Sequence, residues 1–279
     1  MKNLSYTYGV LLAGLLSACA TQKAVVPAAV PASSTLAVDG KLWSSLWQQR
    51  AAEYKALCFQ AYNIARLRLD LALQQQPAGK PLAIITDIDE TVLDNSPNSV
   101  SQALQGKDYE PQAWLNWTSK AVADTVPGAP SFLKYAASKG VTIYYITNRS
   151  EPERESTLVN LQKYGFPNAD DAHLLLKQAS SGKEPRRQQV QQTHTIVLLL
   201  GDNLADFATL FEKRSIEDRT QFVQQQAANF GDKFIVLPNA NYGDWEGAIY
   251  KYNYGLTPEQ KEAMIKAALI QESDRSAKY

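Results

Sequence analysis

Five short apolar segments, separated by stretches with helical periodicity, limit the folds open to this chain. The segments are residues 82–86, 141–146, 173–176, 195–200 and 234–237. Runs of this kind are typical of strands buried on both faces, and strands that alternate with helices form a mainly parallel sheet. The helical patterns are at 129–138, 151–164, 184–192, 205–211 and 215–229. The sequence therefore predicts an α/β fold with a mainly parallel five-stranded sheet and helices on both of its faces.

Polar residues directly follow three of these five segments. Asp87 and Asp89 come after the first, Thr147 after the second and Asp202 after the fourth, with Asp206 four positions later. Ligands of parallel sheets bind beyond the carboxyl ends of the strands. We therefore expect the four aspartates to lie close together at one edge of the sheet.

Four carboxylates in one pocket repel one another unless a cation lies among them. A hard, oxygen-preferring ion such as Mg²⁺ suits such a site, and phosphoryl oxygens can bridge a metal ion and a lysine. The alternative is that each aspartate only caps the helix after its strand. Helix capping alone does not explain why polar residues follow three separate strands that end at the same edge of the sheet. We therefore favour a site for phosphoryl chemistry.

The residues of these motifs also resemble a known family. The segment 87–96, DIDETVLDNS, is similar to the nucleophile motif of the class C acid phosphatases of the outer-membrane lipoprotein e type, in the haloacid dehalogenase superfamily. Residues 147–149, 201–207 and 238–246 also match, so the resemblance covers most of the chain. It implies a haloacid dehalogenase-like Rossmannoid core with sheet order 3-2-1-4-5, plus a smaller helical lobe.

The resemblance assigns a role to each aspartate. Asp87 resembles the nucleophile and Asp89 the general acid/base. The metal ion, Mg²⁺, would be held by the side chains of Asp87 and Asp202 and by the backbone carbonyl of Asp89. Asp206 would act around the metal through water. The implied reaction is hydrolysis of phosphate monoesters through an aspartyl-phosphate at acidic pH, with 5′-nucleotides, nicotinamide mononucleotide and aryl phosphates as substrates.

Other residues are expected to bind the phosphoryl group and the rest of the substrate. Thr147 resembles the group that hydrogen-bonds the transferring phosphoryl, and the neighbouring Asn148 is expected to contact substrate. Lys183 resembles the phosphoryl-binding lysine. Lys177 competes for this role, but it directly follows an apolar strand whereas Lys183 begins the helix before the fourth strand.

Two aromatic residues resemble a clamp for a nucleobase or another ring. Trp114 and Tyr242 occupy the corresponding positions in the family. The alternative is packing of the helical lobe, because Trp114 and Trp117 share one face of a predicted helix.

The N-terminus has the features of a bacterial lipoprotein signal. A short apolar stretch at 9–16 precedes Cys19, and residues 16–19 (LSAC) resemble a lipobox. We expect a signal peptide over 1–18 and lipidation of Cys19. Ala20 after the cysteine favours the outer membrane, with the protein attached by its lipid on the periplasmic or surface face. An ordinary secretory signal that happens to contain a cysteine is the alternative.

The remaining chain divides into a core and an accessory lobe in this interpretation. The predicted parts are a lipidated N-terminus and tether (19–40), N-terminal helices of the lobe (41–80), the catalytic core (81–94 and 127–240), and the lobe's insert and C-terminal helices (95–126 and 241–279). The spacing between motifs leaves no room for a large inserted cap.

Composition narrows the range of partners. Lys+Arg 28 equals Asp+Glu 28, so nothing indicates a nucleic acid polymer as partner. The resemblance implies small-molecule phosphate monoesters as substrates and a homodimer as assembly. Two other functions stay open: a phosphotransferase that uses the same aspartyl-phosphate, and a haem-binding surface lipoprotein. The two histidines have no partners at ligand spacing, which disfavours haem.

Overall fold

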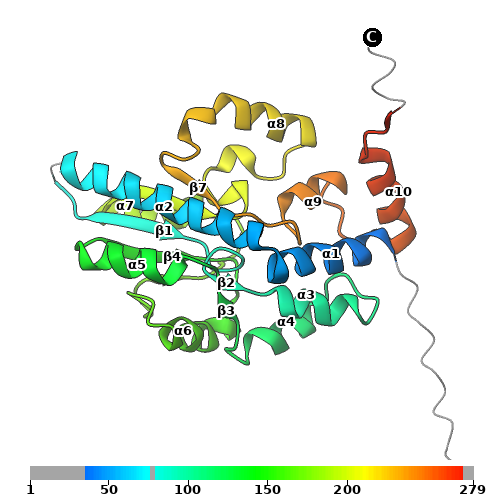
Figure 1. Ribbon diagram of the computed structural model, residues 1–279, viewed down its shortest axis with the longest axis horizontal. Helices are drawn as coiled ribbons and strands as arrows, with labels where there is room; N and C mark the ends of the chain where they lie inside the picture. Colours follow the sequence, from blue (N-terminus) through cyan, green and yellow to red (C-terminus); the bar gives the residue numbers. More distant parts are fainter. Residues whose placement is uncertain (1–34, 76–78, 273–279) are drawn as a thin grey trace, which may run out of the picture. The chain divides into compact units, whose positions relative to one another are not determined.

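A sheet of five parallel strands lies at the centre of the protein, and helices cover both of its faces (Figure 1). The strands, in spatial order, are β5 (Leu174–Leu175), β4 (Thr142–Ile146), β1 (Leu82–Thr86), β6 (Thr195–Gly201) and β7 (Phe234–Val236). In chain order this is 3-2-1-4-5, which confirms the predicted sheet. The computed structural model describes residues 35–75 and 79–272. The predicted signal peptide and Cys19 lie outside these residues.

The central strand β1 is buried on both of its faces, so its sequence does not alternate between apolar and polar residues. Ala83 and Ile84 are both fully buried although they point to opposite faces of the sheet. Ile84 belongs to the core on one face, while Ala83 and Ile85 belong to the core on the other. Burial of each large aliphatic side chain contributes roughly 1.5–3 kcal/mol, so both faces stabilise the strand that leads to the aspartates.

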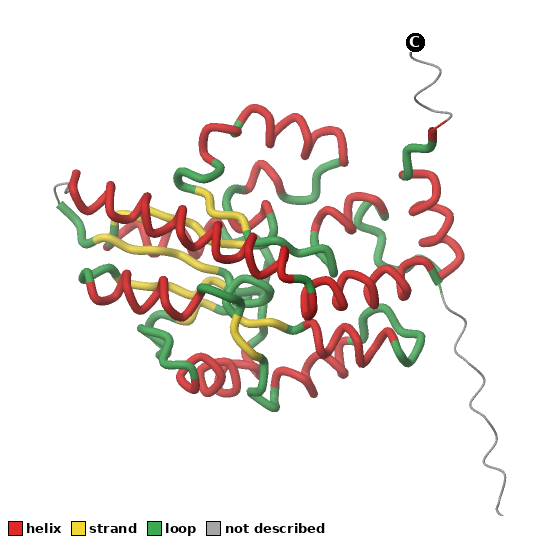
Figure 2. Tube along the Cα trace, in the orientation of Figure 1, coloured by secondary structure: helices red, strands yellow, loops and turns green. Residues whose placement is uncertain are grey.

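Different helices form the two cores. The core on the Ile84 face includes residues of α2 (Ala52–Gln75), α5 (Ala129–Ser138) and α6 (Arg154–Lys163). The core on the opposite face contains Val190 of α7 (Glu184–Thr193) and a cluster of phenylalanines near β7. The tube trace in Figure 2 shows the strands between these helical layers.

A second group of helices lies beside the sheet in Figure 1. It consists of α1 (Leu36–Arg50), α3 (Ser96–Ala103), α4 (Pro111–Thr118), α9 (Asp244–Ile249) and α10 (Pro258–Ala268). Within it, α1 contacts α3 and α10, and α9 contacts α10. A short antiparallel pair, β2 (Leu93–Asp94) and β3 (Asp124–Thr125), joins the ends of the 95–126 insert.

The division into a catalytic core and an accessory lobe stays a prediction, and the packing of α2 bears on where their boundary lies. We expected α2 to belong to the lobe, whereas it packs along β6, β7 and α5 as well as meeting α1. Among the described helices, none combines the length and the apolar character needed to cross a lipid bilayer.

One predicted helix is wrong. Residues 205–211 form two short 3₁₀ turns, η2 (Leu204–Asp206) and η3 (Thr209–Phe211), instead of a continuous helix. Ala208 between them is extended, with φ −157° and ψ 149°. The side chain of Asp206 accepts a hydrogen bond from the backbone N–H of Asn203, which turns the chain back toward the end of β6 and ends the helical geometry early. The predicted helix at 215–229 is likewise shorter: α8 (Ile216–Gln225) is followed by the 3₁₀ turn η4 (Ala227–Asn229).

Candidate active site

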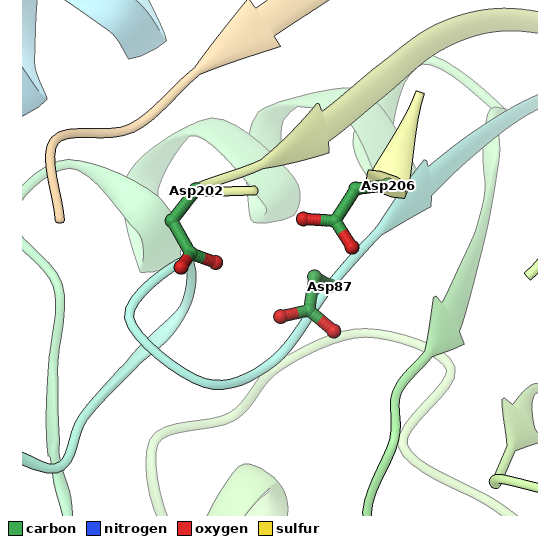
Figure 3. A group of neighbouring side chains, drawn as sticks. All are labelled: Asp87, Asp202 and Asp206. Atoms are coloured by element: carbon green, nitrogen blue, oxygen red, sulfur yellow. The ribbon is translucent and has the colours of Figure 1, made fainter. Parts of the chain in front are cut away.

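The carboxyl ends of β1 and β6 bring three aspartates together (Figure 3). Asp87 directly follows β1, Asp202 directly follows β6, and Asp206 comes from the turn η2. One carboxylate oxygen of each lies within 4.8 Å of the others. The structure therefore gathers three of the four aspartates that we expected at this edge of the sheet.

A glycine and a turn place Asp206 in this group. A Cβ atom on Gly201 would lie 2.3 Å from Oδ2 of Asp206, so only glycine at the end of β6 lets the carboxylate lie across it. The same oxygen accepts a hydrogen bond from the N–H of Asn203 at 3.0 Å. These two features fix the orientation of the Asp206 side chain.

Lys183 is the cation of the cluster. It stands directly before α7 and is only 5% exposed. Its Nζ atom lies 2.6 Å from Oδ1 of Asp206 and donates a hydrogen bond to Oδ1 of Asp87. Lys177, the competing candidate, has an exposed side chain, and its backbone N–H donates to the carbonyl of Arg149.

The cluster is crowded with negative charge. The pKa of Asp87 is raised to about 7, chiefly by burial; Lys183 opposes this rise, while the charges of Asp206 and Asp89 contribute to it. Burial, followed by repulsion from Asp206 and Asp87, also holds the pKa of Asp202 well above its usual range. A divalent cation would relieve this repulsion, and an all-oxygen set of carboxylates suits a hard cation. The donor set thus fits a metal ion of the Mg²⁺ type.

The carboxylate of Asp89 points to a different partner. Its Oδ1 receives hydrogen bonds from Nη2 of Arg149 at 2.7 Å and from Nδ2 of Asn95 at 2.9 Å. Arg149 is 2% exposed and also donates to Oγ1 of Thr157. Asp89 still lines the same cavity as Asp87. The carboxyl group of Asp89 can therefore face a molecule bound in the cavity although it is not part of the cluster formed by Asp87, Asp202 and Asp206.

Thr147 and Asn148 follow β4 and are held by one arginine. Thr147 is fully buried, and its Oγ1 accepts from the N–H of Arg149 at 3.1 Å. Asn148 is exposed and lines the cavity. Arg186, itself 2% exposed, donates to the carbonyl of Thr147 and to Oδ1 of Asn148. The guanidinium therefore supports the segment that we expected to bind the phosphoryl group.

One cavity of about 460 Å³ contains the reactive groups and both predicted clamp residues. Trp114 lines it and donates from Nε1 to Glu153 at 2.9 Å. Tyr242 lines it and donates from its hydroxyl to Glu90. Trp117, on the same helix as Trp114, instead packs against the core and donates to Asn95. The two tryptophans thus divide between the cavity and the core.

Glu90 anchors Tyr242 to the segment that follows β1. The residue is 1% exposed and has φ 58°, in the left-handed region. Burial, and next the charge of Asp89, raise the pKa of its carboxyl to about 8. It accepts hydrogen bonds from the Tyr242 hydroxyl and from the N–H of Asn95. Glu90 therefore couples the position of an aromatic cavity wall to the segment that carries Asp87 and Asp89.

Comparison with known families decides the class of this site. A family model described as HAD superfamily, subfamily IIIB (Acid phosphatase), matches residues 5–245, where HAD denotes haloacid dehalogenase. The chain belongs to this acid phosphatase subfamily. The resemblance inferred from the sequence motifs and the assignment as a phosphatase are both confirmed.

Solved structures agree with this membership. The class C acid phosphatase from Bacillus anthracis is 47% identical, has a TM-score of 0.81, and aligns over 84% of this chain and 98% of its own. A structure of that enzyme with tungstate bound matches equally, with 47% identity, a TM-score of 0.81 and the same coverage of 84% and 98%. A plant relative, the stem 31 kDa glycoprotein of Glycine max, is 27% identical over 128 residues, which are 44% of this chain and 50% of that protein. The phosphatase spans half the length of this plant relative.

Arg149 and Arg186 support the phosphatase site, as Glu90 does, although none of the three was assigned a role there from the sequence. Arg149 stood inside a matched motif, next to Thr147, but its pairing with Asp89 crosses 60 positions of sequence. Arg186 stands near the start of a predicted helix, where the sequence is equally consistent with a side chain that faces the substrate and with one that faces solvent. For Arg149 the sequence did offer a signal, because this arginine lies two positions after the polar residue Thr147 at the end of a predicted strand. For Arg186 the only signal was its place in the helix that Lys183 begins.

Replacing Lys183 with methionine should lower kcat/KM of the phosphatase for a phosphate monoester by at least about a hundredfold. The loss follows because Lys183 is the buried cation in contact with Asp87, and removing a preorganised charge at a reacting centre costs about 10²–10³ in rate. Lys177→Met is the matched control, since its side chain is exposed; its activity should stay within about twofold of the original enzyme. Equal losses in the two variants, measured by phosphate release, would contradict the assignment.

Proposed function

We propose that this acid phosphatase hydrolyses phosphate monoesters through an aspartyl-phosphate on Asp87, with Mg²⁺ as its metal ion. The observation that carries the proposal is the setting of Asp87. This residue lines the cavity, contacts Lys183 and has a carboxylate oxygen close to one of Asp202. A carboxylate that is both accessible to a substrate and adjacent to a buried cation can attack an electrophilic phosphorus.

The reaction divides into two displacements. An Oδ atom of Asp87 attacks phosphorus, the bond from phosphorus to the ester oxygen breaks, and Asp89 gives its proton to the leaving alcohol. Asp89, now a carboxylate, then takes a proton from water as the water attacks the phosphorus of the aspartyl-phosphate. Cleavage of the phosphorus–Asp87 bond returns the carboxylate and releases inorganic phosphate. Because Asp89 must begin the first step protonated, we propose an optimum on the acid side of neutrality.

The protein supplies charge and hydrogen bonds around the phosphoryl group. Lys183 neutralises charge that develops on the phosphoryl oxygens, and Thr147 and Asn148, directly after β4, are placed to hydrogen-bond the phosphoryl group. Mg²⁺, held by the side chains of Asp87 and Asp202 and the carbonyl of Asp89, would supply further neutralisation of the phosphoryl oxygens. We assign Asp206 to the surroundings of the metal, where its carboxylate also holds Lys183. The tungstate complex of the Bacillus anthracis enzyme supports an oxyanion site, since tungstate is tetrahedral like phosphate.

The leaving group is proposed to be a nucleoside, a nicotinamide riboside or an aryl alcohol. Trp114 and Tyr242 both line the cavity beside the reactive aspartates, so a planar ring attached to the phosphate can pack on aromatic side chains. A phosphotransferase would use the same aspartyl-phosphate with an alcohol in place of water. Nothing in the described residues favours an alcohol site over water, so hydrolysis is the function that we propose first.

The location and assembly of the phosphatase are proposals from the sequence. The lipobox-like segment that ends at Cys19 supports a lipid anchor in the bacterial outer membrane, facing either the periplasm or the cell surface. Family resemblance supports a homodimer. Labelling with a radioactive fatty acid should mark the protein in bacterial cells and should fail for a Cys19→Ser variant.

A panel of phosphate esters tests the function directly. Phosphate release is measured with 5′-nucleotides, nicotinamide mononucleotide, sugar phosphates and aryl phosphates, each with EDTA and with added Mg²⁺. We expect release at acidic pH that EDTA abolishes and Mg²⁺ restores. Transfer to an added alcohol that exceeds hydrolysis would favour the phosphotransferase. Haem binding without any chelator-sensitive release would instead favour a haem-binding lipoprotein.

A further inference from the structure

The active-site cavity continues beyond the aspartates to a second end that the proposed reaction does not use. This distal end is lined by side chains of α1, α3, α9, α10 and the segment before α4. The residues that matter here are Lys41, Asn98, Gln102, Asp108, Glu246 and Lys261. Because one cavity contains both ends, a leaving group attached to a phosphoryl group at Asp87 can extend into the distal end.

The two lysines of the distal end are already paired. Nζ of Lys41 lies 2.8 Å from Oδ1 of Asp108 and 3.6 Å from Oε2 of Glu246. Nζ of Lys261 lies 2.6 Å from Oδ2 of Asp108. Two cations and two carboxylates leave no net charge, so a second anionic group on the substrate would enter a partly buried place without a free counter-ion. Such an anion is unfavourable there.

Two side-chain amides, rather than the paired lysines, can form hydrogen bonds with a ligand at the distal end. Asn98 and Gln102 lie one turn apart on α3, are 7% and 4% exposed, and line the cavity. Within residues 35–75 and 79–272, the Asn98 amide has no hydrogen-bond partner. The Gln102 carbonyl accepts from the N–H of Glu110 at 2.7 Å, which leaves its NH₂ group unpaired within the same described residues. Nearly buried amides without partners are costly unless water or a ligand satisfies them.

We propose that Asn98 and Gln102 bind a neutral, amide-type edge of a planar leaving group. Asn98 offers both a donor and an acceptor and Gln102 offers a donor, which complements a carbonyl beside an N–H or NH₂ group. The inference rests on the proposed phosphatase function, because it concerns how the leaving group is held while the phosphoryl group reacts at Asp87. It predicts selection for rings whose edge carries a neutral amide group and against rings whose edge carries a carboxylate.

Three substrates that share one leaving oxygen test this site. Nicotinamide mononucleotide carries a carboxamide on a pyridinium ring, nicotinate mononucleotide carries a carboxylate at the same position of the same pyridinium ring, and ribose 5-phosphate has no aromatic ring. We expect kcat/KM for the carboxamide to exceed that for the carboxylate by about tenfold. In Asn98→Leu and in Gln102→Met, the ratio of kcat/KM for nicotinamide mononucleotide to that for ribose 5-phosphate should fall by about tenfold. Using a ratio within each variant removes any change in the chemical step.

The control variant lies on the same helix. Ser101 is exposed and outside the cavity lining, so Ser101→Ala should leave both ratios unchanged. Asn98→Ala replaces Asn98→Leu if the larger side chain prevents folding, because alanine cannot overpack the site. Unchanged ratios in the folded Asn98 and Gln102 variants, or a preference of the unmodified enzyme for the carboxylate, would overturn the inference while leaving the phosphatase function intact. A failure to release phosphate from all three substrates would overturn the proposed function itself.

Discussion

Replacing Asp87 with asparagine should abolish phosphate release and leave the fold intact. The amide cannot act as an anionic nucleophile, so we expect kcat to fall by at least about a thousandfold. Folding should tolerate the change because asparagine has nearly the same shape. The substitution also removes a carboxyl group whose pKa burial raises to about 7, and Lys183 keeps Asp206 as its partner at 2.6 Å. The measurement is phosphate release from an aryl phosphate, with thermal unfolding as the check on folding.

A surface aspartate provides the matched control for this variant. Asp232 is exposed and pairs with Arg68 at 3.1 Å, so Asp232→Asn should retain full activity. After an acid quench with radiolabelled substrate, the unmodified enzyme should carry covalent phosphate and Asp87→Asn should not. Retention of more than a few per cent of activity in a folded Asp87→Asn protein would show that another group is the nucleophile.

The sheet could be predicted because each strand has a local signature. The segment 82–86 is apolar throughout since both faces of β1 are covered, and the same holds for most of β6. The strand ends then fix where polar residues gather, so the meeting of Asp87 and Asp202 follows from topology alone. Lys183 could be chosen over Lys177 on similar grounds, because the start of a crossover helix lies near the strand ends whereas Lys177 continues a strand.

The pairing of charged groups could not be predicted in this way. Sequence position places Asp89 beside Asp87, yet its carboxylate binds Arg149, 60 positions away. Likewise Lys41 and Lys261 meet at Asp108 from opposite ends of the described chain. Such contacts depend on how whole helices pack, and no local pattern encodes them. The shortening of the 205–211 helix has the same origin, since it depends on the side chain of Asp206 turning back to Asn203.

Magnesium should stabilise the protein more at pH 7 than at pH 5. In the metal-free protein, burial raises the pKa of Asp87 from its ordinary 3.8 to about 7, so the folded state binds this proton more tightly than the unfolded state. The stability that this group contributes is therefore fully present below about pH 4 and is lost as pH rises through 7. Mg²⁺ binds the ionised carboxylates and competes with the proton, which reverses the loss at pH 7 and has less effect at pH 5. At about 100 times its Kd, a ligand stabilises by about 2.7 kcal/mol, or roughly 5 to 10 °C in Tm for a chain of this size.

The measurement is thermal unfolding in EDTA and in excess Mg²⁺ at the two pH values. Subtracting the EDTA value at each pH removes the contributions of other titrating groups, such as Asp108, which do not contact the metal-binding carboxylates. Asp87→Asn should reduce the difference between pH 7 and pH 5, because one of the two metal-binding carboxyl groups with a raised pKa, Asp87 and Asp202, can no longer titrate, whereas Asp232→Asn should keep the full difference. An increase in Tm that is equal at both pH values, or larger at pH 5, would mean that Mg²⁺ does not bind among these aspartates, since a cation held by ionised carboxylates must compete with their protons.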